Sequence, residues 1–213
     1  MSSEAPIGAD DRRAQILEAT VRVISARGAD AARFVDVAEA AGVSVGAIQH
    51  HFGSRAALVA EAFRALNDRA HADYQAIAKG DAPPLERLVA LLRLSVCGAV
   101  GDELDREWAV WLEYWSTANR DPRLRREAAD IYEQWRDPFR EAIVQGIACG
   151  QLRPRFPVED ILDRLVAQID GLALRAMLEP ERLPTERVLE LLVASLSLEL
   201  GAEPGGGGHA ETG

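Results

Sequence analysis

The side chains best suited to chemistry lie within one short stretch, residues 44–50, of the 213-residue chain. This stretch offers a hydroxyl, an amide and an imidazole, carried by Ser44, Gln49 and His50. The sequence has no glycine-rich phosphate loop, no nucleophile elbow and no run of metal ligands that would turn these groups into a catalytic site. The chemistry they suit is hydrogen bonding to phosphates and to the edges of bases.

These residues follow a tight turn between two short helical segments. Residues 34–41 show helical periodicity and end at Gly42, which can take the positive φ that the turn needs. Ser44 can then cap a second helix over residues 45–51. Two helices joined by a three-residue turn form a helix-turn-helix, whose second helix directs its N-terminus and its small or polar face outward. The alternative is an ordinary helical hairpin that packs inside the protein.

The predicted DNA-binding residues have small or polar side chains on the second helix, or are arginines that flank the pair of helices. They are Arg33, Ser44, Val45, Ala47, Gln49, His50 and Arg55. Arginine can reach a phosphate from either flank. The adjacent imidazoles of His50 and His51 point about 100° apart on a helix, so they suit no shared metal ion, and no metal site is expected.

The net charge of −10 is unusual for a protein that binds nucleic acid, but the charge is unevenly distributed. Residues 11–55 carry six arginines against five acidic residues, so the acidity lies in the rest of the chain. This distribution permits phosphate binding at one end. No apolar stretch approaches the ~18 residues of a membrane span, the first residues lack the apolar core of a secretory signal, and two cysteines cannot form a disulfide framework. We expect a cytoplasmic protein that does not bind membranes.

Almost every segment repeats its apolar residues with the 3.6-residue period of a helix, and no segment reads convincingly as a strand. The prediction is an all-α fold of about nine helices. Pro138 is expected to kink or break its helix near residues 134–137, because proline removes a backbone hydrogen bond. After the helix-turn-helix, helices are expected over residues 55–78, 85–100, 103–119, 122–148, 159–178 and 185–200.

This pattern divides the chain into four expected parts. We expect a flexible N-terminus over residues 1–10 and a helix-turn-helix DNA-binding domain over residues 11–55. A ligand-binding and dimerisation domain is expected over residues 56–200, followed by a disordered, glycine-rich tail over residues 201–213. The helix over residues 55–78 would join the two domains and act as a lever between them.

Aromatic side chains and one carboxylate are the candidate ligand-binding groups of the larger domain. Trp108, Trp111 and Trp115 share one face of their helix and can form core, the wall of a ligand site, or both. Asp170 interrupts an apolar run, and a buried carboxylate needs a partner from the protein or from a ligand. These residues are therefore predicted to bind a small-molecule effector.

The chemical class of the effector follows from charge. Aromatic faces in an acidic domain suit an organic cation, such as a quaternary amine or a polyamine. A neutral or acidic hydrophobic effector would instead require an arginine, such as Arg140 or Arg175, to point inward.

The last two helices carry apolar residues on more than one face. In the helix over residues 159–178, one side holds Leu165 and Ile169, while another holds Ala167, Gly171, Leu174 and Leu178. A helix that is apolar on two faces must be buried by its own core and by something else. The last two helices are therefore predicted to form a four-helix homodimer interface.

The N-terminal quarter of the chain resembles the DNA-binding domain of the TetR family of transcriptional repressors. The motif is Gly-Val-Ser-x-Gly from Gly42, followed by His-Phe-x-Ser-Arg that ends at Arg55. Residues 111–115 (Trp-Leu-Glu-Tyr-Trp), 121–124 (Asp-Pro-Arg-Leu) and 170–173 (Asp-Gly-Leu-Ala) resemble the choline-repressor, or BetI-like, branch of that family. The resemblance implies an all-helical homodimer with an N-terminal three-helix DNA-binding domain and a ligand-sensing body.

Three positions depart from the family pattern. Gln49 stands where a tyrosine that commonly touches phosphate is usual, and glutamine can bond phosphate or read an adenine edge. Arg33 replaces a small hydroxyl residue before the first helix of the pair, and arginine cannot cap as serine does. Arg55 replaces the usual lysine and keeps its charge.

The sequence therefore predicts a transcriptional regulator that binds double-stranded operator DNA as a homodimer. It is expected to act as a repressor that a small-molecule effector releases from its operator. No catalytic residue and no cofactor are expected. The alternatives are a helical adaptor that does not bind DNA and a small helical enzyme.

Overall fold

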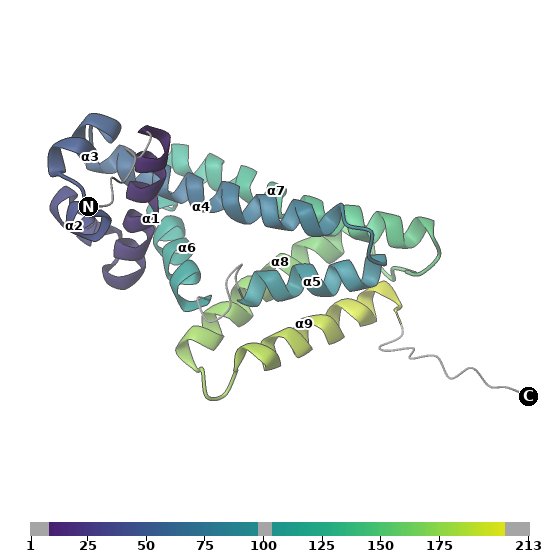
Figure 1. Ribbon diagram of the computed structural model, residues 1–213. Helices are drawn as coiled ribbons and strands as arrows, with labels where there is room; N and C mark the ends of the chain where they lie inside the picture. Colours follow the sequence, from purple (N-terminus) through teal and green to yellow (C-terminus); the bar gives the residue numbers. More distant parts are fainter. Residues whose placement is uncertain (1–8, 98–103, 203–213) are drawn as a thin grey trace, which may run out of the picture. The chain divides into compact units, whose positions relative to one another are not determined.

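The structure is a computed structural model that describes residues 9–97 and 104–202 (Figure 1). Within these ranges the chain forms nine α-helices, one short 3-10 turn (Ala29–Ala31) and no strand, which confirms the predicted all-α fold. The helices are α1 (Ala9–Arg27), α2 (Phe34–Ala41), α3 (Val45–Phe52), α4 (Arg55–Ala78), α5 (Pro84–Cys97), α6 (Leu104–Ala118), α7 (Pro122–Ala148), α8 (Val158–Leu178) and α9 (Thr185–Leu200).

Parts of four predicted segments lie outside the described residues. They are most of the flexible N-terminus, most of the C-terminal tail, the last residues of the helix expected over residues 85–100 and the first residue of the helix expected over residues 103–119. Of the N-terminal segment, Ala9 and Asp10 already belong to α1. Gly201, the first residue of the expected tail, closes α9 with a φ of +60°.

The chain is divided into two compact units, which we call the first and the second unit. The first unit contains Met1–Ala70 and Glu103–Ile131, and so holds α1, α2, α3 and α6 with the beginnings of α4 and α7. The second unit contains His71–Asp102 and Tyr132–Gly213, and so holds α5, α8 and α9 with the ends of α4 and α7.

The core of the first unit is organised around α1, which packs against α2 and α6. The apolar stripe of α1 is buried, including Ile16, Ala19 and Ile24. Thr20 is buried in the same stripe because its hydroxyl donates a 2.8 Å hydrogen bond to the carbonyl of Ile16. Gly28 ends α1 with a φ of +80°.

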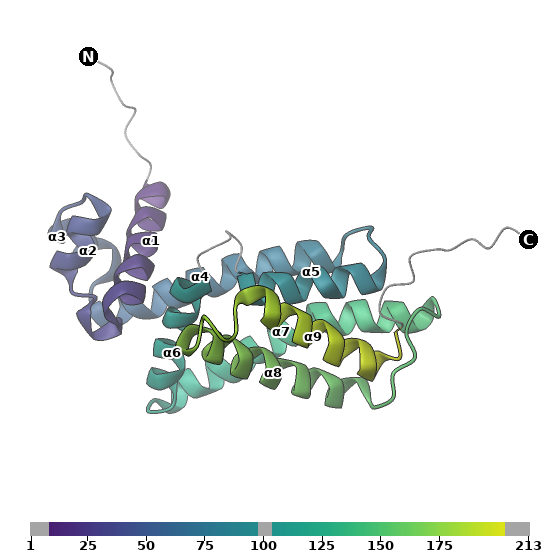
Figure 2. The same ribbon diagram turned by 90° about the horizontal axis from the view of Figure 1, so that it is seen from below.

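In the second unit α9 packs against both α5 and α8 (Figure 2). Their shared core consists of leucine, isoleucine and valine side chains: Leu88, Leu91, Leu92, Ile161, Leu162, Leu165, Val188, Leu192 and Leu196. One buried arginine, Arg87, joins further helices of this unit. Its guanidinium donates to the carbonyl of Ala78 at the end of α4, and to Oε1 of Gln145 in α7 at 2.5 Å. A cation at the C-terminus of α4 also complements the helix dipole.

Pro138 was expected to kink or break its helix, and the break is wrong, because α7 is one continuous helix from Pro122 to Ala148. The kink stays a prediction. Pro138 is buried, and Phe139, Ala142 and Ile143 after it are buried too. Burial of this face stabilises the helix enough to offset the one backbone hydrogen bond that proline removes.

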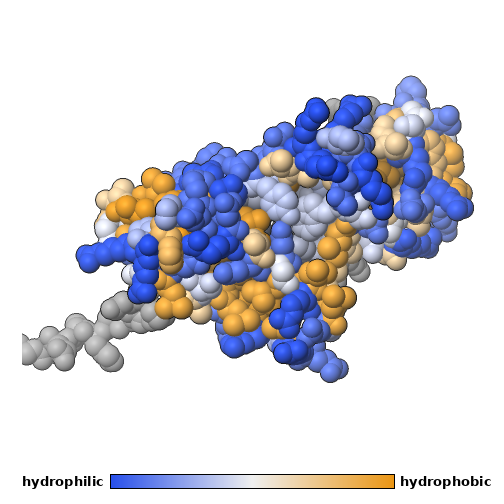
Figure 3. All heavy atoms as spheres, turned by 180° about the vertical axis from the view of Figure 1, so that it is seen from behind, coloured by the Kyte–Doolittle hydropathy of each residue, from blue (hydrophilic) through white to orange (hydrophobic). Residues whose placement is uncertain are grey.

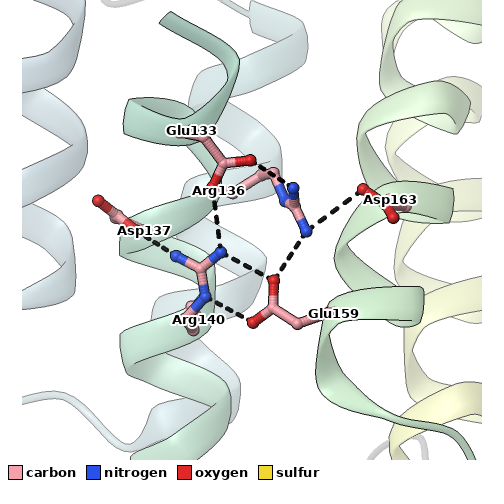
Figure 4. Close-up of polar contacts among 6 residues, drawn as sticks. All are labelled: Glu133, Arg136, Asp137, Arg140, Glu159 and Asp163. Atoms are coloured by element: carbon pink, nitrogen blue, oxygen red, sulfur yellow. Dashed lines mark hydrogen bonds and ion pairs between the residues drawn. The ribbon is translucent and has the colours of Figure 1, made fainter. Parts of the chain in front are cut away.

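Charged side chains fasten α7 to α8 in the second unit (Figure 4). Arg136 donates to Glu159 at 2.8 Å, and Arg140 bonds both oxygens of the same carboxylate at 2.8 and 2.9 Å. These bonds raise the pKa of Arg140 and lower the pKa of Glu159. Three further carboxylates complete the cluster: Glu133, Asp137 and Asp163.

Candidate functional site

The turn between α2 and α3 has the backbone that the sequence predicts. Gly42 takes the left-handed conformation, with φ +64° and ψ +33°, and so ends α2. The amide of Val43 then donates to the carbonyl of Ala38 at 3.0 Å. Ser44 begins α3, and its hydroxyl accepts a 3.2 Å hydrogen bond from the amide of Ala47. The predicted helix-turn-helix is therefore present, with its glycine and its serine cap in the expected roles.

α3 has one buried face and one exposed face. Ile48 and Phe52 are buried in the first unit, whereas Val45 is 42% exposed. The predicted DNA-binding side chains lie away from the buried face: Ser44, Val45, Gln49 and His50 are exposed and Ala47 is half-buried. The structure thus brings the α3 part of the predicted set together on one accessible surface, of a size and polarity that suit a major groove.

Side chains of α1 hold α2 by its C-terminus. The amide of Gln15 donates to the carbonyl of Ala41 at 2.9 Å, and the guanidinium of Arg22 donates to the carbonyl of Ala40 at 3.3 Å. The last carbonyls of a helix have no partner within the helix, so these bonds stabilise the end of α2 just before the turn. The sequence pattern did not predict them.

Arg13 of α1 joins α3 to α4. Its guanidinium lies 5.2 Å from the centre of the Phe52 ring, and it forms an ion pair with Glu61. A cation above an aromatic face is attracted by the ring's quadrupole. The end of α3 is thereby fixed relative to α1 and α4 within the first unit.

The two arginines that flank the helix-turn-helix differ in their surroundings. Arg33 is exposed at the N-terminus of α2 and forms no side-chain cap there, as the sequence predicts for arginine. Arg55 is 42% exposed; its guanidinium donates to the carbonyls of Ala29 and Ala32, the latter at 3.2 Å, and forms an ion pair with Asp30. The structure therefore gives Arg55 a structural role that sequence reasoning missed. Its contact with phosphate stays a prediction.

The tryptophan-rich face of α6 belongs largely to the core of the first unit. Trp108 and Trp111 are buried and Trp115 is half-buried. The Trp115 ring centre lies 5.8 Å from that of Trp108 and 6.2 Å from that of Trp111. Burial accounts for the spacing of these residues, and their part in ligand binding stays a prediction.

Tyr114, on the same helix, is a buried polar residue that the sequence pattern did not single out. Its ring meets the ring of Phe63 from α4 at 5.0 Å in an edge-to-face arrangement. Burial raises the pKa of its hydroxyl to about 12. Beside it, Arg64 of α4 donates to Glu127 of α7 at 2.8 Å. The pattern Trp-Leu-Glu-Tyr-Trp signals an aromatic face but cannot show which of its polar atoms lacks a partner.

Asp170 belongs to the second unit, whereas the three tryptophans belong to the first. The sequence predicts that a buried carboxylate here needs a partner, and the structure supplies one. The hydroxyl of Tyr132 donates to Oδ2 of Asp170 at 2.8 Å. Burial nevertheless raises the pKa of Asp170 to about 6. The pKa of Tyr132 is also raised, by burial of its hydroxyl and by the negative charge of Asp170.

The arginines that an acidic effector would need are engaged with protein carboxylates. Arg140 is bonded by the acidic cluster of α7 and α8. Arg175 is exposed and donates to Glu179 at 3.4 Å. Both guanidinium groups are therefore already bonded to carboxylates of the protein.

Within the described ranges, no three metal-binding side chains gather to form a site, and no helix is long and apolar enough to cross a membrane. Cys149, at the end of α7, is exposed.

Comparison with known proteins agrees with this geometry. Residues 16–62 match the family described as bacterial regulatory proteins, tetR family, and residues 84–201 match the C-terminal part of BetI-type transcriptional repressors. The transcriptional regulator PksA of Bacillus subtilis is 31% identical over 86% of this chain and 87% of its own. The regulator BetI of Rhizobium meliloti is 32% identical over 84% and 85%. A Saccharomonospora viridis protein crystallised in complex with choline has a TM-score of 0.79 and 28% identity, over 88% of this chain and 96% of that one.

Proposed function

The chain belongs to the TetR family of bacterial transcriptional regulators, with a C-terminal part of the BetI type, and on that premise we propose that it is a cytoplasmic repressor released from its operator by a small molecule. The observation that carries the proposal is the exposed, polar face of the Ser44-capped helix α3. Residues 11–55 form the DNA-binding domain of this proposal, and residues 56–200 form the domain for ligand binding and dimerisation.

The DNA contacts divide into two kinds. Ser44 and the amides at the start of α3 suit a phosphate, as does the exposed guanidinium of Arg33. Val45 and Gln49 lie four residues apart, on one face of α3, so both would enter the major groove together. A valine suits the methyl group of thymine, and a glutamine suits the edge of adenine.

The dimer of this proposal uses the outer faces of α8 and α9. On one face of the molecule, apolar side chains reach the surface in patches separated by hydrophilic ones (Figure 3). Leu174 and Leu178 are 37% and 73% exposed, and they continue a stripe that begins at Ala167 and Gly171, which are also exposed. On α9, Leu198 is 66% exposed. Exposed apolar side chains on both helices of each subunit suit a four-helix interface.

The effector of this proposal is an organic cation. Trp108, Trp111 and Trp115 of the first unit would supply aromatic faces for this cation. The carboxylate of Asp170, in the second unit, is the other group that we propose for ligand binding. A relative with 28% identity was crystallised with choline, which belongs to this class. The engagement of Arg140 and Arg175 with carboxylates argues against an acidic effector.

Coupling between effector and DNA can pass through the first unit. α6, which carries the tryptophans, packs against α1, and α1 holds α2 and α3 by the bonds of Gln15, Arg22 and Arg13. Where α1 ends, the Glu113 carboxylate of α6 is so near Gly28 that a Cβ on this glycine would lie 3.3 Å from its oxygen. An effector that shifts α6 therefore changes the position of α1, with α4 as the second connection. Such a ligand must bind the released state several kcal/mol more tightly than the DNA-bound state.

The test begins with selection of a duplex from a random library by the purified protein. We expect a palindromic sequence, whose affinity falls steeply as salt is raised, because a DNA binder releases counterions. Choline chloride, with sodium chloride at equal ionic strength as control, is then expected to release that duplex. Trp111→Ala or Asp170→Asn should abolish the release while the dimer stays folded. Enrichment of no duplex would refute DNA binding and favour the helical adaptor.

A further inference from the structure

The chain has three tyrosines, and their hydroxyl groups differ in whether they have a hydrogen-bond partner. The hydroxyl of Tyr74 donates to Oγ of Ser95 at 2.8 Å, and that of Tyr132 donates to Asp170 at 2.8 Å. The hydroxyl of Tyr114 has no hydrogen-bond partner in the part of the chain that the structure describes, although this residue is only 1% exposed. Folded proteins rarely leave a buried hydroxyl unsatisfied, because its lost hydration is not replaced.

The surroundings of Tyr114 are aromatic. The ring of Phe63 lies edge-to-face with it at 5.0 Å, and the ring of Trp111 lies perpendicular to it at 6.0 Å. The rings of Trp108 and Trp115 continue the same face of α6. Sites for small ligands are usually lined by apolar and aromatic side chains, with a few polar groups that orient the ligand.

The charges beside Tyr114 leave its hydroxyl as a neutral hydrogen-bonding group. Arg64 and Glu127 neutralise one another through a bidentate contact with N–O distances of 2.8 and 3.4 Å. Burial is the main reason why the pKa of Tyr114 is raised, to about 12, so the hydroxyl keeps its proton at neutral pH. It can therefore donate one hydrogen bond and accept another.

We propose that the Tyr114 hydroxyl recognises an oxygen atom of the effector, and so selects organic cations that carry a hydroxyl group over those that do not. This inference rests on the cation response proposed above and assigns a specificity-determining residue to it. The aromatic rings would hold the cationic head group, and Tyr114 would satisfy the ligand's oxygen.

The first experiment compares Tyr114→Phe with Tyr74→Phe in the absence of any ligand. Tyr74→Phe removes a hydroxyl that is bonded to Ser95, and its melting temperature should fall by about 2–4 °C. Tyr114→Phe removes a hydroxyl without a partner, so its melting temperature should stay unchanged or rise. An equal fall in both variants would mean that the Tyr114 hydroxyl is satisfied by the protein, and would overturn the inference.

The second experiment measures binding of choline and of ethyltrimethylammonium, which resembles choline in shape but lacks the hydroxyl. The wild type and Tyr74→Phe should bind choline about 3- to 10-fold more tightly, as expected for one hydrogen bond. Tyr114→Phe should bind both cations with similar affinity. If it discriminates as the wild type does, the hydroxyl holds a buried water only, and the inference fails while the proposed function stands. Equal affinity of the wild type for both cations would also overturn the inference. If the wild type binds neither cation, the proposal that the effector is an organic cation is wrong as well.

Discussion

Tyr132 in α7 and Asp170 in α8 form a 2.8 Å hydrogen bond in which the phenol donates to the carboxylate. Burial raises the pKa of Asp170 to about 6, even though this bond favours the ionised form. The folded state therefore binds the proton of Asp170 more tightly than the unfolded chain does, where the carboxyl has a pKa of about 3.9. The contribution of this group to stability is fully present below pH ~4 and is lost as the pH rises through 6.

Asp170→Asn should therefore stabilise the protein at neutral pH. The amide oxygen can still accept from Tyr132 and needs no ionisation, so we expect the free energy of unfolding to rise by roughly 1–3 kcal/mol at pH 7.5. The gain should shrink toward zero near pH 4. Urea unfolding at several pH values measures both effects. A gain that does not change with pH would show that the carboxylate titrates as an exposed group.

Arg33 and Arg55 should respond differently to substitution. Arg33→Ala is expected to leave the melting temperature unchanged, because the side chain is exposed at the start of α2, and to weaken binding to every duplex. The slope of log affinity against log salt should fall by about 1 for each phosphate that the variant no longer neutralises. Fluorescence anisotropy at several salt concentrations measures this slope.

Arg55→Ala should also destabilise the protein, by about 1–2 kcal/mol, because it removes the bonds to the carbonyls of Ala29 and Ala32. Arg55→Lys separates the two roles, since it keeps the charge but cannot bond both carbonyls as the guanidinium does. If Arg55→Lys restores the salt dependence of operator binding but not the free energy of unfolding, Arg55 binds phosphate in addition to the carbonyls of Ala29 and Ala32. A folded Arg33→Ala/Arg55→Ala double variant with unchanged operator binding would refute both assignments.

Gln49→Ala should change sequence preference more than overall affinity. Gln49 lies one helical turn after Val45 on the exposed face of α3, which is where a side chain reaches a base edge. We expect discrimination at one base-pair position to weaken by about 1–3 kcal/mol, seen as relaxed selection at that position in a random library. Gln151→Ala, an exposed glutamine of the second unit, serves as the control. A uniform decrease in affinity across all sequences would instead place Gln49 on phosphate.

Local features of the sequence were sufficient to predict the helices and the turn. Gly42 and Ser44 fix the boundary between α2 and α3 because backbone freedom and capping act over three or four residues. The exposed face of α3 follows from the four-residue spacing of the apolar Ile48 and Phe52, which are both buried. These properties depend on residues that are close together in the chain, so the sequence predicts them without knowledge of the tertiary structure.

Contacts between distant segments could not be predicted in the same way. Arg55 meets residues that precede it by more than twenty positions, and no periodicity indicates that pairing. The continuity of α7 through Pro138 depends on how well its neighbours are buried, which is a property of the packed unit. The unsatisfied hydroxyl of Tyr114 is likewise visible only when every nearby donor and acceptor has been placed.

Leu178→Glu should separate the dimer into monomers. Leu178 is 73% exposed and Leu174 is 37% exposed on α8, so neither contributes much to the core of its own subunit. A carboxylate at position 178 would be buried in the proposed four-helix interface. There it would lose its hydration without gaining a partner of opposite charge. Gly171 lies on the same stripe with no atom near its missing Cβ, so Gly171→Trp should obstruct the same surface by bulk rather than by charge.

Sedimentation velocity at micromolar concentration measures the outcome. We expect the wild type to sediment as a dimer, and Leu178→Glu and Gly171→Trp to sediment as folded monomers with unchanged helical circular dichroism. Operator affinity should fall by roughly 100-fold or more, because a monomer binds only one half-site. Val144→Glu is the matched control, since Val144 is 52% exposed on α7, outside the α8 and α9 stripes, and this variant should remain dimeric. If Leu178→Glu stays dimeric while Val144→Glu dissociates, the interface lies on α7 and the assignment to the last two helices is wrong.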